Sequence, residues 1–227
     1  MNNKSFITLV SAMISILCSA QDNTTVIVAD RVENKSITID GNLDDWNTTP
    51  LIIGLVEPWL GSQRDSTRFY ACRDAEFLYL LFDVTEESLY YSIAEEERSV
   101  DNSDRIEFFI CKDSLMHEYY CMEITPHGKV MDYKAEYYRK FDYEWTFDTL
   151  VLSTDIDDRK YYIEAAVPIK WLKRMGLISD DSSIIFGVFR ADFIEGEKSM
   201  INWYTWIDPS TRNPEFHVPA ALGRLIL

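Results

Sequence analysis

The sequence contains little histidine, few basic residues and only one long apolar run. Its three histidines are dispersed, which gives little support to a histidine-based catalytic triad or metal site. Lysine and arginine total 22 against 38 aspartates and glutamates, for a net charge of −16. Nucleic acid is therefore excluded as a partner, because binding phosphates requires a basic surface. The G-x-S-x-G, H-E-x-x-H and P-loop motifs are absent as well, so the common serine hydrolases, zinc proteases and nucleotide enzymes are not indicated.

Cysteine is scarce and odd in number outside the first twenty residues. Cys72, Cys111 and Cys121 remain once Cys18 is set aside, and three cysteines do not make a complete disulfide framework. Cys111 and Cys121 flank a predicted hairpin turn and could face each other across it. We favour the alternative, in which all three are buried thiols that pack as small hydrophobes.

The one long apolar run lies at the N-terminus. Lys4 precedes the mainly apolar residues 6–17, and 18–20 (Cys-Ser-Ala) place small residues at the positions that signal peptidase reads. The run is shorter than the roughly 20 residues of a membrane span. We predict a signal peptide over 1–20, and therefore a protein that is secreted, periplasmic or on the cell surface. A lipoprotein signal at Cys18 is the alternative, but Ile16 and Leu17 stand where that signal has small residues.

Residues 21–227 show no repeat, linker or low-complexity tract, and we interpret them as one domain that is monomeric and has no transmembrane segment. Pro168 and Gly176 bound one short predicted helix over 169–175. Residues 21–34 form an N-terminal arm that can pair at a sheet edge. Period-2 patterns and short apolar runs predict strands at 36–40, 67–72, 77–84, 105–111, 118–125, 128–133, 149–153, 161–167, 184–193 and 223–227. This pattern predicts an all-β fold, an antiparallel β-sandwich with jelly-roll or immunoglobulin-like layers.

Four segments together resemble the family 9 carbohydrate-binding modules of the DOMON-like superfamily. They are IDGNLDDW at 39–46, NSDRIEFFI at 102–110, YIEAAVP at 162–168 and FHVPAALG at 216–223. Each motif is weak alone, but their order and spacing are specific. The resemblance implies non-catalytic binding of carbohydrate, with xylan or glucan as the family-weighted ligand. It also implies that no cofactor is required and that a structural calcium site is possible, with ligands that the sequence does not assign. Within the motifs we expect Trp46 and Phe216 to be core residues and His217 to be buried and hydrogen-bonded.

Sugar binding combines flat aromatic faces with planar polar side chains that hydrogen-bond hydroxyl groups. Arg190 and Asp192 share one face of a predicted strand, and the polar segment 201–206 follows with Asn202, Trp203 and Trp206. The resemblance places sugar contacts in this region. Both tryptophans are candidate ligand contacts; we predict that Trp206 is the exposed stacking face, and Trp203 is the one we expect in the core if one of them is a core residue.

A second candidate group is Asp104, Arg105 and Glu107. Alternation puts Arg105 and Glu107 on one strand face and Ile106 with its apolar neighbours on the other. The polar pair then either lines a binding site or forms an ordinary surface ion pair, which contributes little stability.

Two further candidates come from loops. Trp59 lies on a loop between Pro58 and Gly61, and the resemblance implies that it forms one wall of an aromatic clamp with Trp206 as the other. Arg73, which follows a predicted strand, is a possible donor to sugar hydroxyls.

Three other functions compete with sugar binding. A glycoside hydrolase needs two carboxylates about 5–9.5 Å apart, and Asp104 with Glu107 or Asp192 with Glu195 are the available pairs. A haem-binding domain of the same superfamily needs methionine or histidine ligands, whose placement near turns does not indicate a haem pocket. An adhesion domain without sugar specificity is the third.

Overall fold

The computed structural model describes residues 25–60, 67–86, 88–194 and 201–227. The predicted signal peptide over 1–20 lies outside the described residues. Within them, no helix is both long enough and apolar enough to cross a lipid bilayer.

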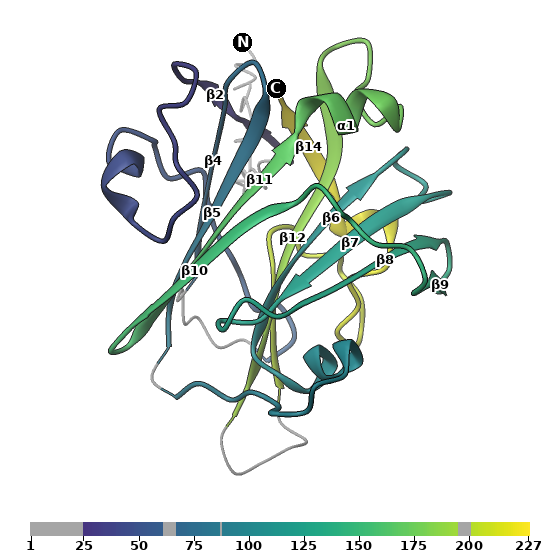
Figure 1. Cartoon of the computed structure of the whole chain (residues 1–227). Coiled ribbons are helices and arrows are strands. Elements are labelled where there is room, and N and C mark those ends of the chain that lie inside the picture. The colour runs from purple at the N-terminus through teal and green to yellow at the C-terminus, as the bar shows by residue number, and fades with distance from the viewer. Residues whose placement is uncertain (1–24, 61–66, 87, 195–200) are drawn as a thin grey trace, which may run out of the picture.

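Two β-sheets face each other across one core (Figure 1), which confirms the all-β sandwich. In spatial order the larger sheet contains β1 (Val26–Val28), β14 (Gly223–Ile226), β12 (Ser183–Phe193), β6 (Arg105–Cys111), β7 (Tyr119–Ile124), β8 (Val130–Glu136) and β9 (Lys140–Asp142), and β13 (Ile201–Thr205) also pairs with β12. The smaller sheet contains β10 (Val151–Asp157), β11 (Lys160–Pro168), β5 (Phe77–Thr85), β4 (Thr67–Arg73) and β2 (Asp30–Arg31), and β3 (Ile53–Gly54) also pairs with β4.

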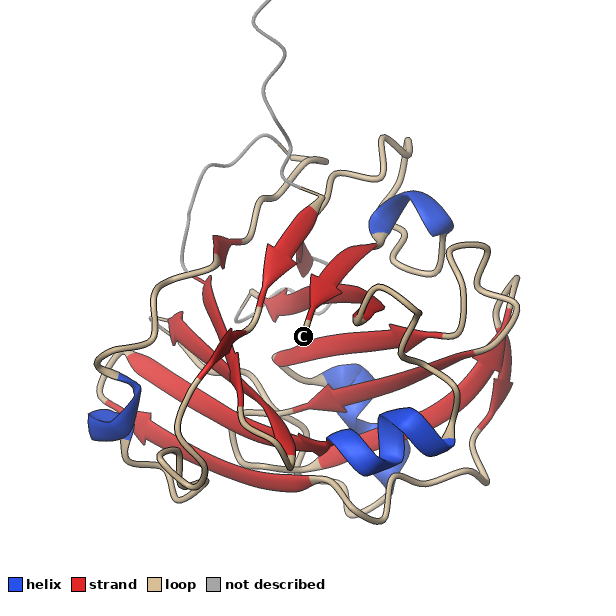
Figure 2. Ribbon diagram, turned by 90° about the horizontal axis from the view of Figure 1, so that it is seen from above, coloured by secondary structure: helices blue, strands red, loops and turns tan. Residues whose placement is uncertain are grey.

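The N-terminal arm pairs at sheet edges, as predicted. β1 runs parallel to β14 and β2 runs parallel to β4, whereas the other strand pairs are antiparallel. Seen from above, the strands form curved layers and the few helices lie around their margins (Figure 2).

The larger sheet is apolar on both faces. Ile106 and Phe108 of β6 point into the core between the sheets, where the ring of Phe108 stacks on Phe82 of β5. Phe109 points to the other face and packs against Phe189 of β12 in a second buried cluster. Full burial of such a side chain stabilises the fold by about 1.5–3 kcal/mol. The outer face of this sheet is therefore covered, and the segments that cover it form the walls of a pocket.

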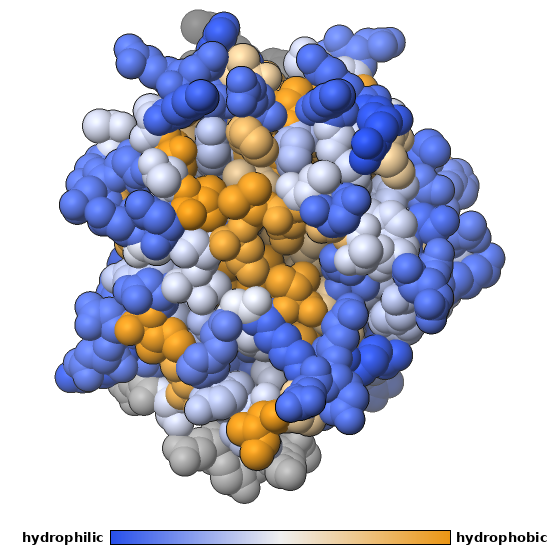
Figure 3. All heavy atoms as spheres, in the orientation of Figure 1, coloured by the Kyte–Doolittle hydropathy of each residue, from blue (hydrophilic) through white to orange (hydrophobic). Residues whose placement is uncertain are grey.

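The strand β10 forms one edge of the smaller sheet and exposes both apolar and acidic side chains. Val151 and Ile156 of this strand are exposed. Figure 3 shows one face of the molecule, where apolar side chains gather in the middle and hydrophilic side chains surround them. Asp155 and Asp157 also lie exposed on this strand. Charges on an edge strand oppose pairing with another chain.

The helix prediction is confirmed: α1 spans Ile169–Arg174, Pro168 is its N-cap, and Gly176 follows it with a positive φ of 67°. The strand predicted over 36–40 is wrong. The amide N–H groups of Asp40 and Gly41 donate instead to a carboxylate oxygen of Glu164 in β11, at 3.2 and 2.5 Å. A turn anchored by a side chain therefore replaces the ladder of strand hydrogen bonds.

Hydrogen bonds to Glu164 join the first motif, 39–46, to the third motif, 162–168. Glu164 also accepts a hydrogen bond of 2.7 Å from the indole Nε1 of Trp46, at the end of the 3₁₀ helix η1 (Leu43–Trp46). Trp46 is 4% exposed, which confirms it as a core residue. Two other 3₁₀ helices are η2 (Glu97–Asn102) and η3 (Pro219–Ala221).

The three cysteines are free, buried thiols, which confirms the favoured interpretation. In the register of β6 and β7, Cys111 lies opposite Tyr119 and Cys121 lies opposite Phe109. The two cysteines are therefore not directly paired across the hairpin. Burial raises the pKa of both thiols well above the ordinary value.

Candidate functional site

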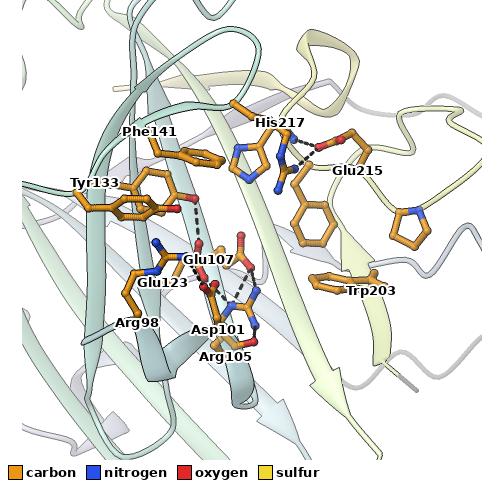
Figure 4. Close-up of a pocket in the computed structure, with 14 residues that line it drawn as sticks. Arg98, Asp101, Arg105, Glu107, Glu123, Tyr133, Phe141, Trp203, Glu215 and His217 are labelled. Atoms are coloured by element: carbon orange, nitrogen blue, oxygen red, sulfur yellow. Dashed lines mark hydrogen bonds and ion pairs between the residues drawn. The ribbon is translucent and has the colours of Figure 1, made fainter. Parts of the chain in front are cut away.

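A pocket of about 320 Å³ opens on the outer face of the larger sheet (Figure 4), a size at the lower end of small-ligand sites. Its residues come from η2, from β6 to β9, from β13 and from the segment before η3. They are Arg98, Asp101, Arg105, Glu107, Glu123, Tyr133, Arg139, Phe141, Tyr143, Trp203, Pro214, Glu215, Phe216 and His217.

The floor of the pocket carries one arginine and two glutamates. Arg105 and Glu107 face outward from β6 because side chains alternate along a strand, and Glu107 lies directly opposite Glu123 of β7. Arg105 reaches both carboxylates, at 3.0 Å from Nη2 to Glu107 and 2.6 Å from Nε to Glu123. All three side chains are at most 6% exposed. The predicted polar pair is therefore a buried charged group in a pocket, not a surface ion pair.

Trp203 forms one wall of the pocket, beside this floor. The register of β6, β12 and β13 sets Arg105, Ala191 and Trp203 side by side. Because Ala191 is small, the guanidinium of Arg105 lies 5.7 Å from the centre of the Trp203 ring. A flat indole face and a planar hydrogen-bonding group thus meet in one place.

The opposite wall is aromatic as well. Tyr133 of β8 packs its ring edge-on against Phe141 and Tyr143, at 5.1 and 5.2 Å between ring centres. Its hydroxyl donates a hydrogen bond of 2.9 Å to Glu123, which ties the wall to the floor. The guanidinium of Arg98 in η2 stacks 4.1 Å over the Tyr143 ring. These side chains give the pocket an apolar face opposite Trp203, as Figure 4 shows.

The rim is organised by Glu215. Its carboxylate accepts hydrogen bonds from the Tyr138 hydroxyl at 2.5 Å, from Arg139 at 3.0 Å and from the backbone N–H of His217 at 2.9 Å. His217 itself is buried, and its Nδ1 shares a hydrogen bond of 2.9 Å with the Tyr119 hydroxyl. Burial, assisted by Arg139 and Arg105, lowers the pKa of His217 to about 3, so its ring is neutral at physiological pH. The expectation of a buried, hydrogen-bonded histidine is confirmed.

The predicted positions of the two tryptophans are reversed. Trp206 is 8% exposed and belongs to the core between the sheets, so it is not the stacking face. Its backbone N–H donates to the carbonyl oxygen of Val188, and its ring lies where a side chain at Gly223 would stand. Trp203 is half-buried and lines the pocket instead. The glycine at 223 is what leaves room for the Trp206 ring on the inner side.

Arg190, Asp192, Asp104 and Asn202 lie in a separate cluster and do not line the pocket. Arg190 is fully buried, ion-paired with Glu86 and 3.4 Å from Asp192. Asn202 donates to Asp192 at 3.1 Å, and Asp104 accepts backbone N–H groups of Tyr90 and Phe193 at 2.7 and 2.6 Å.

Alternation along β12 explains this placement. Arg190 shares its face with Val188, which packs in the core between the sheets, whereas Phe189 and Ala191 face the pocket side. The prediction that Arg190 and Asp192 share a face is correct, but the face is the inner one. Arg190 and Asp104 of this cluster are buried, while Asp192 and Asn202 are half-buried.

Trp59 and Arg73 lie outside the pocket. Trp59 packs beside the pocket wall, 6.1 Å from Phe216 between ring centres, and its Nε1 donates to the carbonyl oxygen of Thr211 at 3.1 Å. It packs against the segment that carries Phe216, and because Trp206 is a buried core residue the predicted clamp is not formed. Arg73 lies in the other sheet, at a cavity shared with Arg31.

Several residues of the pocket were not identified from the sequence. Glu123 could have been, because it is the one charged residue of an otherwise uncharged strand, Tyr119–Ile124. Arg98 lies in a 3₁₀ helix, and Phe141 and Tyr143 lie in and just after the three-residue strand β9, where no periodic pattern indicates which way a side chain points.

Within the described residues, two groups of acidic side chains are candidate sites for the implied calcium. Glu107, Cys121 and Glu123 form one, and Glu86, Asp104 and Asp192 form the other. Ca²⁺ takes six to eight oxygen ligands, but a buried guanidinium already lies against the carboxylates of each group, Arg105 in the first and Arg190 in the second. Neither group fits Ca²⁺, and structural calcium stays a prediction.

Asp104 and Glu107, one of the carboxylate pairs considered for hydrolysis, do not face one cleft. Glu107 lines the pocket, while Asp104 accepts hydrogen bonds from backbone amides in the separate cluster. Asp192 belongs to that same cluster, and Glu195 lies outside the described residues.

A β-sandwich that carries a small pocket with aromatic walls and buried hydrogen-bonding groups is a ligand-binding domain. The chain matches the carbohydrate family 9 binding domain-like family over residues 39–227 and belongs to it. It is thus a carbohydrate-binding domain and not a catalytic one.

Solved structures of other proteins share this fold. A putative carbohydrate-binding protein from Bacteroides uniformis superposes with a TM-score of 0.68 at 14% identity, covering 88% of this chain and 97% of that one. A family 9 carbohydrate-binding module from Caldicellulosiruptor kristjanssonii gives TM-scores of 0.59 in complex with cellotriose and 0.58 in complex with glucose. Identities are 14% and 15%, coverage of this chain is 89% in both, and coverage of the module is 93% and 95%. A comparison with curated proteins gives no match.

Proposed function

We propose that the pocket binds a saccharide unit of a plant-type polysaccharide or oligosaccharide, with xylan or glucan as the first candidates. The observation that carries this proposal is the half-buried indole of Trp203 beside the Arg105 guanidinium. The apolar C–H face of a pyranose stacks on such a ring. At the same time, its hydroxyl groups reach the charged floor.

The floor supplies several kinds of hydrogen-bonding group. Arg105 is a fixed planar donor, because Glu107 and Glu123 hold its guanidinium and the carbonyl oxygens of Asp101 and Ser103 accept from Nη1 at 3.4 Å each. A preorganised donor loses little freedom when a ligand binds. Tyr133, Phe141 and Tyr143 then close the other side of the sugar.

Isothermal titration calorimetry with soluble xylan, β-glucan and their oligosaccharides tests the proposal. Trp203→Ala is expected to lower the affinity at least tenfold, while Tyr91→Ala, an exposed aromatic residue outside the pocket, leaves it unchanged. Unchanged affinity in Trp203→Ala would place the ligand elsewhere. Reducing-sugar release from the same polysaccharides is expected to be absent.

We also infer that the protein is exported, since polysaccharides of this kind lie outside the cell and residues 1–20 fit a signal peptide. N-terminal sequencing of the protein recovered from the periplasm or the medium is expected to begin at Gln21. Retention of Cys18 as a lipidated residue would instead support the lipoprotein alternative. Size-exclusion chromatography with light scattering tests the expected monomer.

A further inference from the structure

The floor of the pocket contains one negative charge more than its arginine can balance. Glu107 and Glu123 occupy directly opposite positions of β6 and β7, where like charges repel. The side chains are 2% and 5% exposed, and both contact the same guanidinium, that of Arg105. Neither carboxylate is stabilised by bulk water.

The other charged groups around the pocket are already paired among themselves. In η2, Arg98 forms an ion pair of 3.2 Å with Asp101. At the rim, Arg139 forms an ion pair of 3.0 Å with Glu215, and His217 is neutral. Arg105 therefore faces two carboxylates, and ionising both would leave an uncompensated buried charge. A buried carboxyl in that position takes up a proton instead.

The hydrogen bonds indicate which carboxyl keeps the proton. Glu123 accepts a hydrogen bond of 2.9 Å from the Tyr133 hydroxyl and lies 2.6 Å from Arg105 Nε as an ion pair, and both contacts favour its charged form. Glu107 accepts a hydrogen bond of 3.0 Å from Arg105 Nε at Oε1, and the same oxygen lies 3.0 Å from Nη2. Within the described residues its other oxygen, Oε2, has no hydrogen bond to the protein, and Glu107 lines the pocket.

We propose that Glu107 is a neutral carboxylic acid at physiological pH, that it donates a hydrogen bond to the bound sugar, and that the pocket therefore selects neutral saccharides over uronic acids and amino sugars. With Glu107 neutral, the three arginines of the pocket are balanced by Asp101, Glu123 and Glu215. A sugar carboxylate then meets no unpaired cation, and a sugar ammonium meets no unpaired anion. Burial, followed by the charge of Glu123, raises the pKa of Glu107 to about 8, against the opposing effect of Arg105.

This inference rests on the proposed function for its ligand class but not for the protonation of Glu107. Carbon-13 NMR of the glutamate carboxyl groups measures that protonation without ligand, and Glu107→Gln assigns the resonance by its loss. We expect Glu107 to titrate near pH 8 and Glu123 to remain ionised at neutral pH. Titration of Glu107 below pH 5 would refute the neutral acid whatever the protein binds.

Calorimetric titrations with glucose, glucuronic acid and glucosamine, and with neutral xylo- and gluco-oligosaccharides, test the selectivity. The affinity for the neutral sugar is expected to fall about tenfold per pH unit above the Glu107 pKa, with proton uptake on binding in that range. Glu107→Gln keeps an N–H donor and is expected to bind with no such fall.

The outcomes separate the two proposals. Tighter binding of glucuronic acid or glucosamine than of glucose would overturn the selectivity while leaving saccharide binding intact. Pronounced pH dependence that persists in Glu107→Gln would place the responsible proton elsewhere and overturn the assignment. No binding of any saccharide between pH 5 and pH 9 would refute the proposed function and the selectivity with it, and the NMR titration would still decide the state of Glu107.

Discussion

Replacement of Glu107 by glutamine is expected to stabilise the protein at neutral pH. The ordinary pKa of a glutamic acid is 4.5 and that of folded Glu107 is about 8. Between these two values the folded state keeps a proton that the unfolded state releases. Because the folded pKa is the raised one, the contribution of Glu107 to stability is complete below pH 4.5 and is lost as the pH rises toward 8.

The magnitude follows from the width of this window. One pH unit inside it changes the free energy of unfolding by about 1.4 kcal/mol. From pH 5 to pH 7 the wild-type protein is therefore expected to lose about 2–3 kcal/mol through this residue. Glu107→Gln preserves the shape and the hydrogen-bonding capacity of the side chain but removes the titration, so the variant gains that amount over wild type across the same interval.

Urea unfolding of both proteins at half-unit steps from pH 4.5 to pH 8.5 measures the difference. The control is Glu118→Gln, since Glu118 is a partly exposed glutamate whose pKa is lowered, first by the Tyr120 hydroxyl that donates to it. Parallel stability curves for wild type and Glu107→Gln would refute the buried acid, because an ionised Glu107 contributes no slope above pH 5.

Three further variants test the scaffold. Glu164→Ala removes the acceptor of the Trp46 indole and of two backbone amides. Chemical unfolding is expected to show a loss of about 3 kcal/mol in the free energy of unfolding. A loss of less than about 1 kcal/mol would contradict the role of Glu164 as the anchor of this turn. Gly223→Ala places a methyl group against the Trp206 ring and the carbonyl oxygen of Thr25. The free energy of unfolding is expected to fall by about 1–3 kcal/mol. An unchanged melting temperature would contradict this packing. Arg190→Met leaves Glu86 and Asp192 without their buried cation and is expected to cost about 3–5 kcal/mol at pH 8 and less at pH 5, because burial raises the pKa of Glu86 and lets it take up a proton. An equal cost at both pH values would contradict that assignment.

The sequence predicted the layers well because strand burial is a local property. Alternation along 105–111 placed Ile106 in the core and Arg105 with Glu107 on the other face, and β6 follows it residue for residue. The same rule could not say which face of 184–193 is the inner one. That strand is apolar on both sides, since Val188 packs between the sheets and Phe189 packs under the pocket. Arg190 was therefore assigned to the wrong side.

The tryptophans show a different limit. Trp203 and Trp206 lie three residues apart around the end of β13, so strand alternation no longer relates them once the strand ends at Thr205. Which ring is sealed depends on a distant glycine, Gly223, in the neighbouring β14. A contact of that kind depends on tertiary structure and leaves no periodic signal. The polar composition of 201–206 indicated a candidate binding segment but not which of its tryptophans lines the pocket.

The motifs that identify the family mainly hold the fold together. Gly41 and Trp46 of the first motif bind Glu164 of the third, and Gly223 of the fourth makes room for a core tryptophan. The pocket takes Arg105 and Glu107 from the second motif.

Its remaining groups lie mostly outside the motifs, in Trp203, in Glu123 and in the aromatic wall that follows β8. The groups that line the pocket are thus largely separate from the residues that identify the family. Ligand choice in this protein should therefore be sought in the wall and in the protonation of the floor, where a single proton on Glu107 sets the charge that the ligand meets.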